Sequence, residues 1–198
     1  MSNSQSSQIS YQELIKIEYK KCMESPVYFM KHYVKINHAM KGAINFNLFK
    51  FQEETLQAFS DYRNNIILKS RQMGISTLVA AYSLWIMIFN KDQSILIISL
   101  KQEDAIDVLS KLAFAYEKLP TWLRLQCIEN NKKSIKFSNG SQIRAASTTK
   151  KSGVGKTLNL LIVDECLEKF TTINIRNKLT KEIKSINIGE LYESKEYK

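Results

Sequence analysis

Five stretches of the chain are predicted to be helices: in three of them apolar residues recur every three or four positions, one is strongly apolar throughout, and one begins with a capping serine and a proline. Those stretches are residues 9–24, 26–33, 49–62, 76–90 and 102–119. Ser25 followed by Pro26 is a typical start for the second helix, because serine caps a helix N-terminus and proline fits its first position. Pro120 should end the last helix, since proline cannot continue one.

Continuous apolar runs between the predicted helices indicate buried β-strands, which are expected over residues 65–69, 94–99 and 158–163. The pair Asn139-Gly140 separates two further strand-like runs, 134–137 and 142–145, and Asn-Gly between strands favours a hairpin. The resulting order is strand, turn, helix, strand, helix, hairpin, strand. It predicts a three-layer α/β domain with a mainly parallel sheet.

The composition restricts the class of protein to which the chain can belong. With 198 residues, 44% of them hydrophobic and 24% charged, the chain suits one soluble domain, or one domain with an appendage. No apolar run approaches the length needed to cross a bilayer. Residues 1–7 are polar and lack the apolar core of a signal peptide, so we expect a disordered tip and no membrane association.

The net charge of +10 favours a polyanionic partner, either nucleic acid or nucleotide, although a basic surface kept for solubility is an alternative. The three cysteines Cys22, Cys127 and Cys166 are odd in number and widely spaced. This arrangement excludes a disulfide framework and zinc-site spacing, and it indicates a reducing cytosol.

A candidate phosphate-binding loop lies where the first predicted strand passes into a helix, because loop N–H groups and a helix N-terminus together attract anions. Its residues are Lys69, Ser70, Arg71, Gln72, Met73, Gly74, Ile75, Ser76 and Thr77. Compared with G-x-x-x-x-G-K-[ST], Ser70 replaces the first glycine and Ile75 replaces the lysine. Lys69 or Arg71 must then reach the phosphates, while Ser76 offers its hydroxyl to Mg²⁺. A plain strand–turn–helix without nucleotide is the alternative.

An acidic pair, Asp164 and Glu165, follows the last buried strand. In a parallel α/β sheet, ligands bind at the carboxyl ends of the strands. Asp164 is expected to hold Mg²⁺, directly or through water, and Glu165 to polarise a water molecule. This is the Walker B pattern of a P-loop ATPase.

A second glycine-rich stretch, residues 153–157, reads Gly-Val-Gly-Lys-Thr. No strand leads into it, and the strand that follows leaves no room for a helix, so the context of a phosphate loop is missing. We interpret it as a mobile polar loop at the same sheet edge. Lys156 remains a candidate for contact with phosphate or DNA.

Residues from about 26 to 165 resemble the N-terminal ATPase domain of the large terminase subunit of tailed phages. The resemblance is carried by Ser-Pro-Val-Tyr-Phe at 25–29, Phe-Gln at 51–52, Ser-Arg-Gln-Met-Gly-Ile-Ser-Thr at 70–77, Ile-Lys-Phe-Ser-Asn-Gly-Ser-Gln-Ile at 135–143 and Leu-Leu-Ile-Val-Asp-Glu at 160–165. It implies an ATP- and Mg²⁺-dependent motor that drives double-stranded DNA into a procapsid, with portal and small terminase as partners, in the host cytoplasm.

The same resemblance implies roles for individual residues. Gln52 would bind adenine, residues 69–76 would form the phosphate loop, Asp164 would bind the metal, and Glu165 would be the catalytic carboxylate. Several terminases carry their lysine at the start of the loop, which favours Lys69. Arg71 is then a possible sensor of γ-phosphate charge.

After Glu165 the sequence resembles the N-terminal block of an intein, with a first cysteine, a threonine-containing strand, and Ile-Gly-Glu-Leu-Tyr at 188–192. Strands are predicted over residues 172–176 and 182–188, with a turn over 177–181. In inteins the first cysteine attacks the preceding carbonyl, which here belongs to Glu165, and forms a thioester. A core role for Cys166 in an unusual terminase is the alternative.

Two regions are therefore expected: an ATPase part over 1–165, with 1–24 as a helical or disordered lead-in, and an intein fragment over 166–198. A separate chain would supply the rest of the intein and the terminase nuclease part, so this chain alone should neither splice nor package DNA. A truncated gene fragment is the competing explanation. A helicase-like ATPase and a non-enzymatic DNA-binding module are alternative functions.

Overall fold

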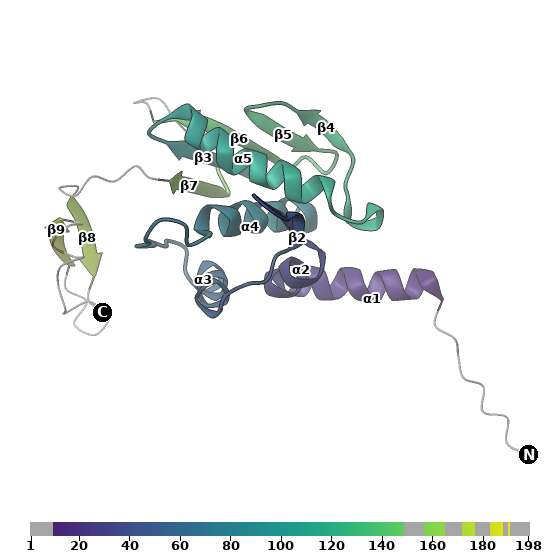
Figure 1. The fold of residues 1–198 in the computed structure, drawn as a ribbon. Coiled ribbons are helices and arrows are strands. Elements are labelled where there is room, and N and C mark those ends of the chain that lie inside the picture. The colour runs from purple at the N-terminus through teal and green to yellow at the C-terminus, as the bar shows by residue number, and fades with distance from the viewer. Residues whose placement is uncertain (1–9, 149–156, 165–171, 177–182, 188–189, 191–198) are drawn as a thin grey trace, which may run out of the picture.

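The computed structural model describes residues 10–148, 157–164, 172–176, 183–187 and 190, which Figure 1 shows in colour. Its helices are α1 (Tyr11–Glu24), α2 (Pro26–Tyr33), α3 (Lys50–Asp61), α4 (Ile75–Phe89), α5 (Gln102–Glu117) and the short 3₁₀ helix η1 (Thr121–Leu123). Its strands are β1 (Lys35–His38), β2 (Gly42–Asn45), β3 (Ser94–Ser99), β4 (Cys127–Asn130), β5 (Ser134–Phe137), β6 (Gln142–Ser147), β7 (Leu160–Asp164), β8 (Thr172–Arg176) and β9 (Ile183–Asn187).

The helices begin and end close to the predicted positions. Ser10 caps α1 through a capping box with Glu13, and the Ser25 side chain accepts a hydrogen bond from the N–H of Tyr28 at the start of α2. All five predicted helices are confirmed. The local signals were sufficient because capping and helical periodicity depend on residues within a few positions of each other.

The main sheet has the strand order β4-β5-β6-β3-β7. Strands β6, β3 and β7 are parallel, whereas β4, β5 and β6 pair antiparallel. The sheet is thus mixed, and the expectation of a mainly parallel sheet holds only for its β7 side. The predicted hairpin is confirmed between β5 and β6, where Gly140 adopts a positive φ of 85°.

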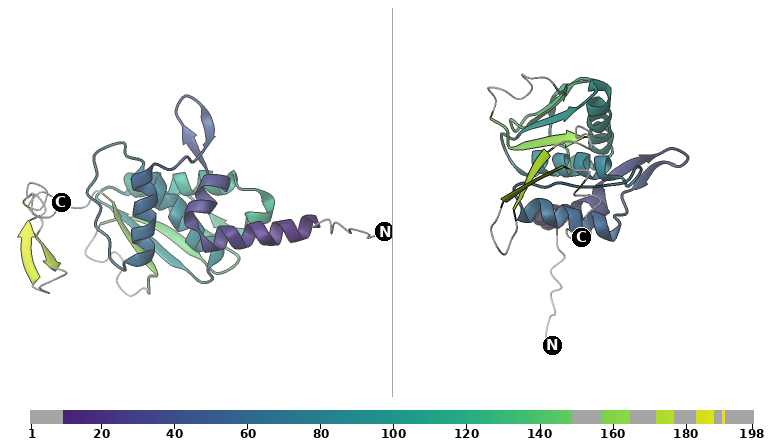
Figure 2. Two further views of the ribbon diagram at one scale, coloured as in Figure 1. Left: turned by 90° about the horizontal axis from the view of Figure 1, so that it is seen from below. Right: turned by 90° about the vertical axis from the view of Figure 1, so that its left-hand side faces the viewer.

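One face of the sheet is covered by helices. Helix α5 packs on β3 and β6, and α4 packs beside α5, so that both helices lie on the same side of the sheet (Figure 2). Ile95 and Ile97 of β3 point into this core and are almost fully buried, whereas Leu161 and Val163 of β7 are about half exposed. Among the described residues, helices cover only this face of the sheet. Helices on the opposite face, which a three-layer fold requires, stay a prediction.

The predicted buried strand at residues 65–69 is wrong for this structure. These residues lie in the loop between α3 and α4, they are exposed, and they pair with no strand among the described residues. A strand needs a neighbour that accepts its backbone hydrogen bonds. Residues 65–69 have the apolar sequence of a strand, but no neighbouring strand pairs with them among the described residues.

Four of the described strands lie outside the main sheet: the β1–β2 hairpin and the β8–β9 pair. The β1–β2 hairpin and strand β4, an edge strand of the main sheet, were not predicted, because each of these strands has only four residues. Strands β8 and β9 form the antiparallel pair expected after residue 166, with Thr172 opposite Asn187 and Arg176 opposite Ile183. No helix in the described part of the chain is long and apolar enough to cross a membrane.

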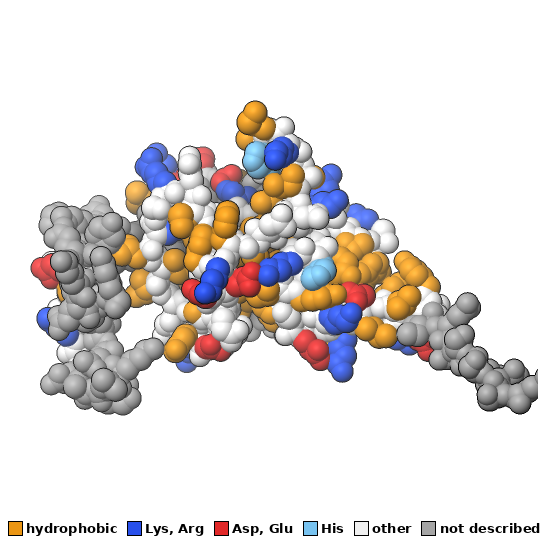
Figure 3. Space-filling model, turned by 60° about the horizontal axis from the view of Figure 1, so that its bottom comes forward, with side chains coloured by type: hydrophobic (Ala, Val, Ile, Leu, Met, Phe, Trp, Pro, Cys, Tyr) orange, Lys and Arg blue, Asp and Glu red, His pale blue; other side chains and the backbone are white. Residues whose placement is uncertain are grey.

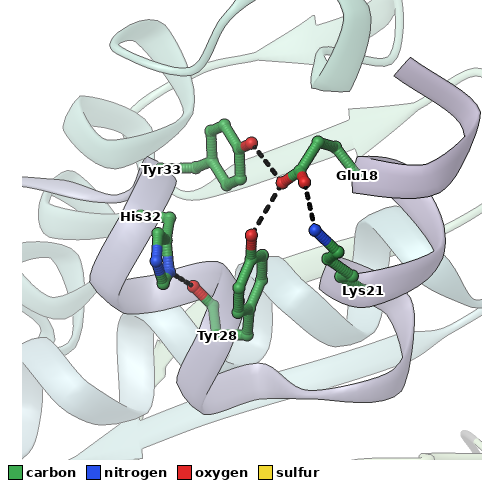
Figure 4. A network of polar contacts seen from close by, with 5 residues as sticks. All are labelled: Glu18, Lys21, Tyr28, His32 and Tyr33. Carbon is green, nitrogen blue, oxygen red and sulfur yellow. Dashed lines mark hydrogen bonds and ion pairs between the residues drawn. The ribbon is translucent and has the colours of Figure 1, made fainter. Parts of the chain in front are cut away.

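The Glu18 carboxylate on α1 connects α1 to α2 through hydrogen bonds (Figure 4). Glu18 accepts hydrogen bonds from the hydroxyls of Tyr28 and Tyr33, each at 2.8 Å, and from the ammonium of Lys21 at 2.6 Å. These three donors lower the pKa of Glu18 to about 2, the Lys21 ammonium contributing most. The indole of Trp85 on α4 donates to the Cys22 carbonyl at 2.8 Å and links α1 to the core.

Candidate nucleotide-binding site

The loop before α4 has the backbone of an anion-binding turn. Gly74, the N-cap of α4, has a φ of 68°, and Gln72 has a φ of 62°, so two residues of this turn lie in the left-handed region. No side chain caps the helix N-terminus. The first N–H groups of a helix have no partners within it, and without a capping side chain they remain suited to an anion such as phosphate.

Three predicted side chains meet at the end of β7. The hydroxyl of Ser76 donates to Asp164 Oδ2 at 3.0 Å, and Lys69 Nζ lies 4.0 Å from Asp164 Oδ1. The side chains of Lys69 and Asp164 are only 26% and 18% exposed, so solvent screens this charge pair less than it screens a surface pair. Residues distant in sequence thus assemble a cation, a hydroxyl and a carboxylate in one place.

The Ser76–Asp164 pair fits a magnesium ion. Mg²⁺ takes oxygen ligands in an octahedron with bonds of about 2.1 Å, so adjacent ligand oxygens lie about 3 Å apart. The 3.0 Å between the Ser76 and Asp164 oxygens matches that separation. Within the described residues no group of three His, Cys, Asp or Glu side chains could hold a metal.

Two residues that the sequence analysis missed hold Asp164 in position. The hydroxyl of Ser99, at the end of β3, donates to the Asp164 carbonyl at 2.9 Å. Thr148, which follows β6, donates both its N–H and its hydroxyl to the Ser99 carbonyl. The carboxyl ends of β6, β3 and β7 are thereby tied together. Their position in the sequence, at or directly after the C-terminal end of a parallel strand, was a partial signal, but the contact with Asp164 follows only from the pairing of β3 with β7.

Gln52 holds the loop through its amide. This side chain is 2% exposed; its Nε2 donates to the Met73 carbonyl at 3.1 Å, and its Oε1 accepts from the N–H of Phe49 at 3.1 Å. These bonds use one of its two N–H donors and one of its acceptor lone pairs. Contact with adenine stays a prediction, and the structure adds a positioning role toward the loop.

The remaining loop residues fall into two groups. Ile75, at the position of the usual lysine, is 7% exposed and packs in the core, so it cannot reach a phosphate. Ser70 and Arg71 are exposed and line, together with Lys69, Ser76 and Asp164, a cavity of about 630 Å³.

Several predicted residues lie outside the described part of the chain. They are Glu165, Cys166 and Lys156 with its neighbours at 153–155. Their expected roles in water activation, splicing and phosphate contact therefore stay predictions.

Residues 66–178 match a protein family described as "Terminase large subunit, T4likevirus-type, N-terminal". The matched range spans more than half of the chain and contains the loop, α4, the main sheet and Asp164. The chain belongs to this terminase family. Membership favours a terminase over the helicase-like alternative.

A solved structure has the same fold as this terminase chain. The crystal structure of the HK97 bacteriophage large terminase aligns with a TM-score of 0.57 and 17% sequence identity, covering 80% of this chain. The aligned region is 33% of the HK97 protein, so this chain spans about one third of the length of that terminase. At 17% sequence identity, the similarity is evidence for a shared fold alone.

The first and last residues of the family match, 66 and 178, matter for two predictions. Gln52 lies before the matched range, so its adenine contact draws no support from it. The match continues to residue 178 and does not mark a boundary between Glu165 and Cys166.

Proposed function

We propose that residues 1–165 form the ATP-binding part of a terminase large subunit, a motor that uses ATP to drive double-stranded DNA into a procapsid. The observation that carries the proposal is the convergence of Lys69 and Ser76 on Asp164 beside an uncapped helix N-terminus. Family membership of residues 66–178 supports it. Portal and small terminase are the proposed partners, in the cytoplasm of an infected host.

Each side chain has a distinct task in this proposal. The loop N–H groups and Lys69 bind the β- and γ-phosphates, while Ser76 and Asp164 hold Mg²⁺, which when bound neutralises phosphate charge. Glu165 orients the attacking water, and Arg71 senses charge on the γ-phosphate. Phosphoryl transfer depends mainly on such positioning and charge stabilisation.

Nucleotide titrations of single variants test the site. In the full chain, Lys69→Ala is expected to weaken Mg·ATP binding at least tenfold, which is about 1.4 kcal/mol. Lys136→Ala, an exposed lysine on β5 far along the sheet, is the matched control and should bind like the parent. If Arg71→Ala abolishes binding while Lys69→Ala leaves it intact, the lysine is wrongly assigned. If the parent binds no nucleotide, the ATPase proposal fails.

A second activity is proposed for residues 166–198, as the N-terminal fragment of a split intein. Its supports are the sequence resemblance after Glu165 and the antiparallel β8–β9 pair that follows Cys166. The Cys166 thiol attacks the Glu165 carbonyl carbon, the peptide C–N bond breaks, and the thiol proton passes to the released amine. The product is a thioester, from which a partner chain would complete splicing.

Mixing experiments test the splicing proposal. The chain is combined with a polypeptide that carries a C-terminal intein fragment and the remaining terminase sequence, and products are weighed by mass spectrometry. A ligated chain joined at Glu165 is expected, and Cys166→Ala should prevent it. Cys127→Ala is the control, because Cys127 lies on β4, at the opposite edge of the main sheet from β7. Ligation that persists in Cys166→Ala, or a ligated product without any partner, would contradict the proposal.

A further inference from the structure

The β1–β2 hairpin projects from the body of helices and strands, as both views of Figure 2 show. Its base is held in the core, since Val34 and Phe46 are 1% and 3% exposed and the Phe46 N–H donates to the Val34 carbonyl at 3.0 Å. Its tip carries Met40, which is 91% exposed. An element with a buried base and a projecting tip can contact a partner that lies outside the body of the protein.

The backbone of the hairpin is hydrogen-bonded up to its tip. Its register runs from Lys35 opposite Asn45 to His38 opposite Gly42. The Lys41 N–H donates to the His38 carbonyl at 3.2 Å and closes the turn, and Gly42 follows with a φ of 66°. The surface of this two-stranded ribbon is therefore formed before a partner binds, which lowers the entropic cost of binding.

The two faces of the ribbon differ in chemistry. Successive residues of a strand point to opposite faces, so Ile36 and Ile44, which are paired and half-buried, share one face. The other face carries Lys35, Asn37 and Asn45, which are all exposed. An ammonium and two amides are hydrogen-bond donors. This exposed face therefore suits a partner that is rich in acceptor oxygens.

The charged side chains of this segment have one sign. Residues 25–52 contain four lysines and both histidines of the chain, and no aspartate or glutamate. Within the described residues, Lys35 and Lys41 form no ion pair. At the tip, His38 Nδ1 accepts the N–H of Met40 at 3.2 Å, which leaves Nε2 as the ring donor. Cations without acidic neighbours in sequence attract a polyanion.

We propose that the β1–β2 hairpin binds the phosphate backbone of double-stranded DNA. Lys35 and Lys41 are the charged contacts, and Asn37 and Asn45 are neutral hydrogen-bond donors. A two-stranded ribbon fits the major groove of B-DNA, and lysine and asparagine side chains commonly donate to phosphate oxygens. Contacts of this kind hold DNA without reading its sequence. The choice of DNA rests on the proposed function, in which DNA is the substrate.

The salt dependence of DNA binding tests the hairpin. A short labelled duplex is titrated with the full chain, and binding is followed by fluorescence anisotropy at several salt concentrations. Each phosphate contact contributes about 0.9 to the slope of log affinity against log salt, so Lys35→Ala/Lys41→Ala is expected to lower the slope by about 1.8 and to weaken binding about tenfold at low salt. Asn37→Ala/Asn45→Ala should weaken binding without changing the slope, because neutral amides release no counterions.

The matched control removes the same charge from another hairpin. Lys132→Ala/Lys133→Ala changes two exposed lysines in the turn between β4 and β5. DNA binding by this variant should equal that of the parent, so that the position of the lysines, and not the net charge, accounts for the effect. Urea unfolding of all variants checks the fold. Each should unfold like the parent, because the substituted side chains are exposed.

Five outcomes would overturn the inference. They are absence of DNA binding by the parent, an unchanged slope in the Lys35/Lys41 variant, an equal loss in the control variant, equal affinity for a heparin fragment, which would make the hairpin a general polyanion site, and self-association of the chain that Met40→Ser abolishes while DNA binding persists in the Lys35/Lys41 variant, which would make a second copy the partner.

Mg·ATP titration of the same samples separates the two proposals. The hairpin variants should bind Mg·ATP like the parent, because none of the substituted residues lines the nucleotide cavity. Nucleotide binding together with DNA affinity that does not depend on the hairpin overturns this inference alone. Hairpin-dependent DNA binding by a chain that binds no nucleotide retains the inference and overturns the ATPase.

Discussion

At the residue scale, Gly74 shows how closely the phosphate loop and α3 approach each other. Its φ of 68° lies in the left-handed region, and a Cβ built on it would lie 2.9 Å from Gln52 Nε2. Glycine is therefore needed here for two reasons, backbone conformation and close contact. The same Gln52 amide donates to the Met73 carbonyl, so an alanine side chain at position 74 would displace the end of the Gln52 side chain from this bond.

A comparison of two glycine variants separates those reasons. Gly74→Ala and Gly42→Ala both place alanine at a positive φ, 68° and 66°, at a cost of about 1–2 kcal/mol. Only Gly74→Ala also displaces Gln52, since nothing lies within 4 Å of a Cβ at Gly42. Urea unfolding should show the greater loss of stability for Gly74→Ala, and Mg·ATP affinity should fall only in that variant. Equal nucleotide affinity in both would mean that the Gln52 contact does not shape the loop.

At the element scale, the helices and the loop at 65–69 show what sequence patterns can and cannot determine. Ser10, Ser25 and Pro26 set helix starts through contacts within three or four residues, so the sequence alone was sufficient. The run at 65–69 has the composition of a strand, but strand formation requires a distant partner. The same limit applies to the site: the loop and Asp164 were recognisable, whereas support from Ser99 appears only once β3 and β7 are side by side.

The α1–α2 contact should weaken in acid. The folded-state pKa of Glu18 is lowered from 4.5 to about 2, because Lys21, Tyr28 and Tyr33 donate to the carboxylate. A lowered carboxyl pKa adds stability that is fully present above pH 4.5 and is lost as pH falls toward 2. Glu18→Gln should therefore be less stable than the parent at pH 7, and equally stable near pH 2.

Unfolding midpoints of both proteins across this pH range measure the effect. Glu24→Gln is the matched control, since Glu24 is an exposed glutamate on the same helix, paired only with Lys20 at 3.8 Å. A stability difference between Glu18→Gln and the parent that stays constant from pH 7 to pH 2 would mean that the carboxylate does not hold the helices together.

At the scale of the whole molecule, the distribution of charge and the length of the chain bear on the proposed function. On the face in Figure 3, Lys and Arg side chains are interspersed with Asp and Glu, so the net charge of +10 forms no continuous basic patch there. The chain spans about one third of the length of the HK97 terminase, and β7 is an edge strand of the sheet formed by the described residues. Under the proposed function, we expect this chain to supply nucleotide binding to the longer terminase.

The chain is accordingly expected to bind Mg·ATP without turning it over. A ligand at 100 times its dissociation constant stabilises the folded state by about 2.7 kcal/mol. For a domain of this size, that is a rise of roughly 5–10 °C in the melting temperature. A non-hydrolysable ATP analogue should give the same rise. Lys69→Ala should give at most about half of it at the same ligand concentration, because a tenfold weaker affinity leaves about 1.4 kcal/mol of stabilisation once the lysine that meets Asp164 is gone. Phosphate release above background by the isolated chain would show instead that the one-third fragment already holds a complete catalytic site.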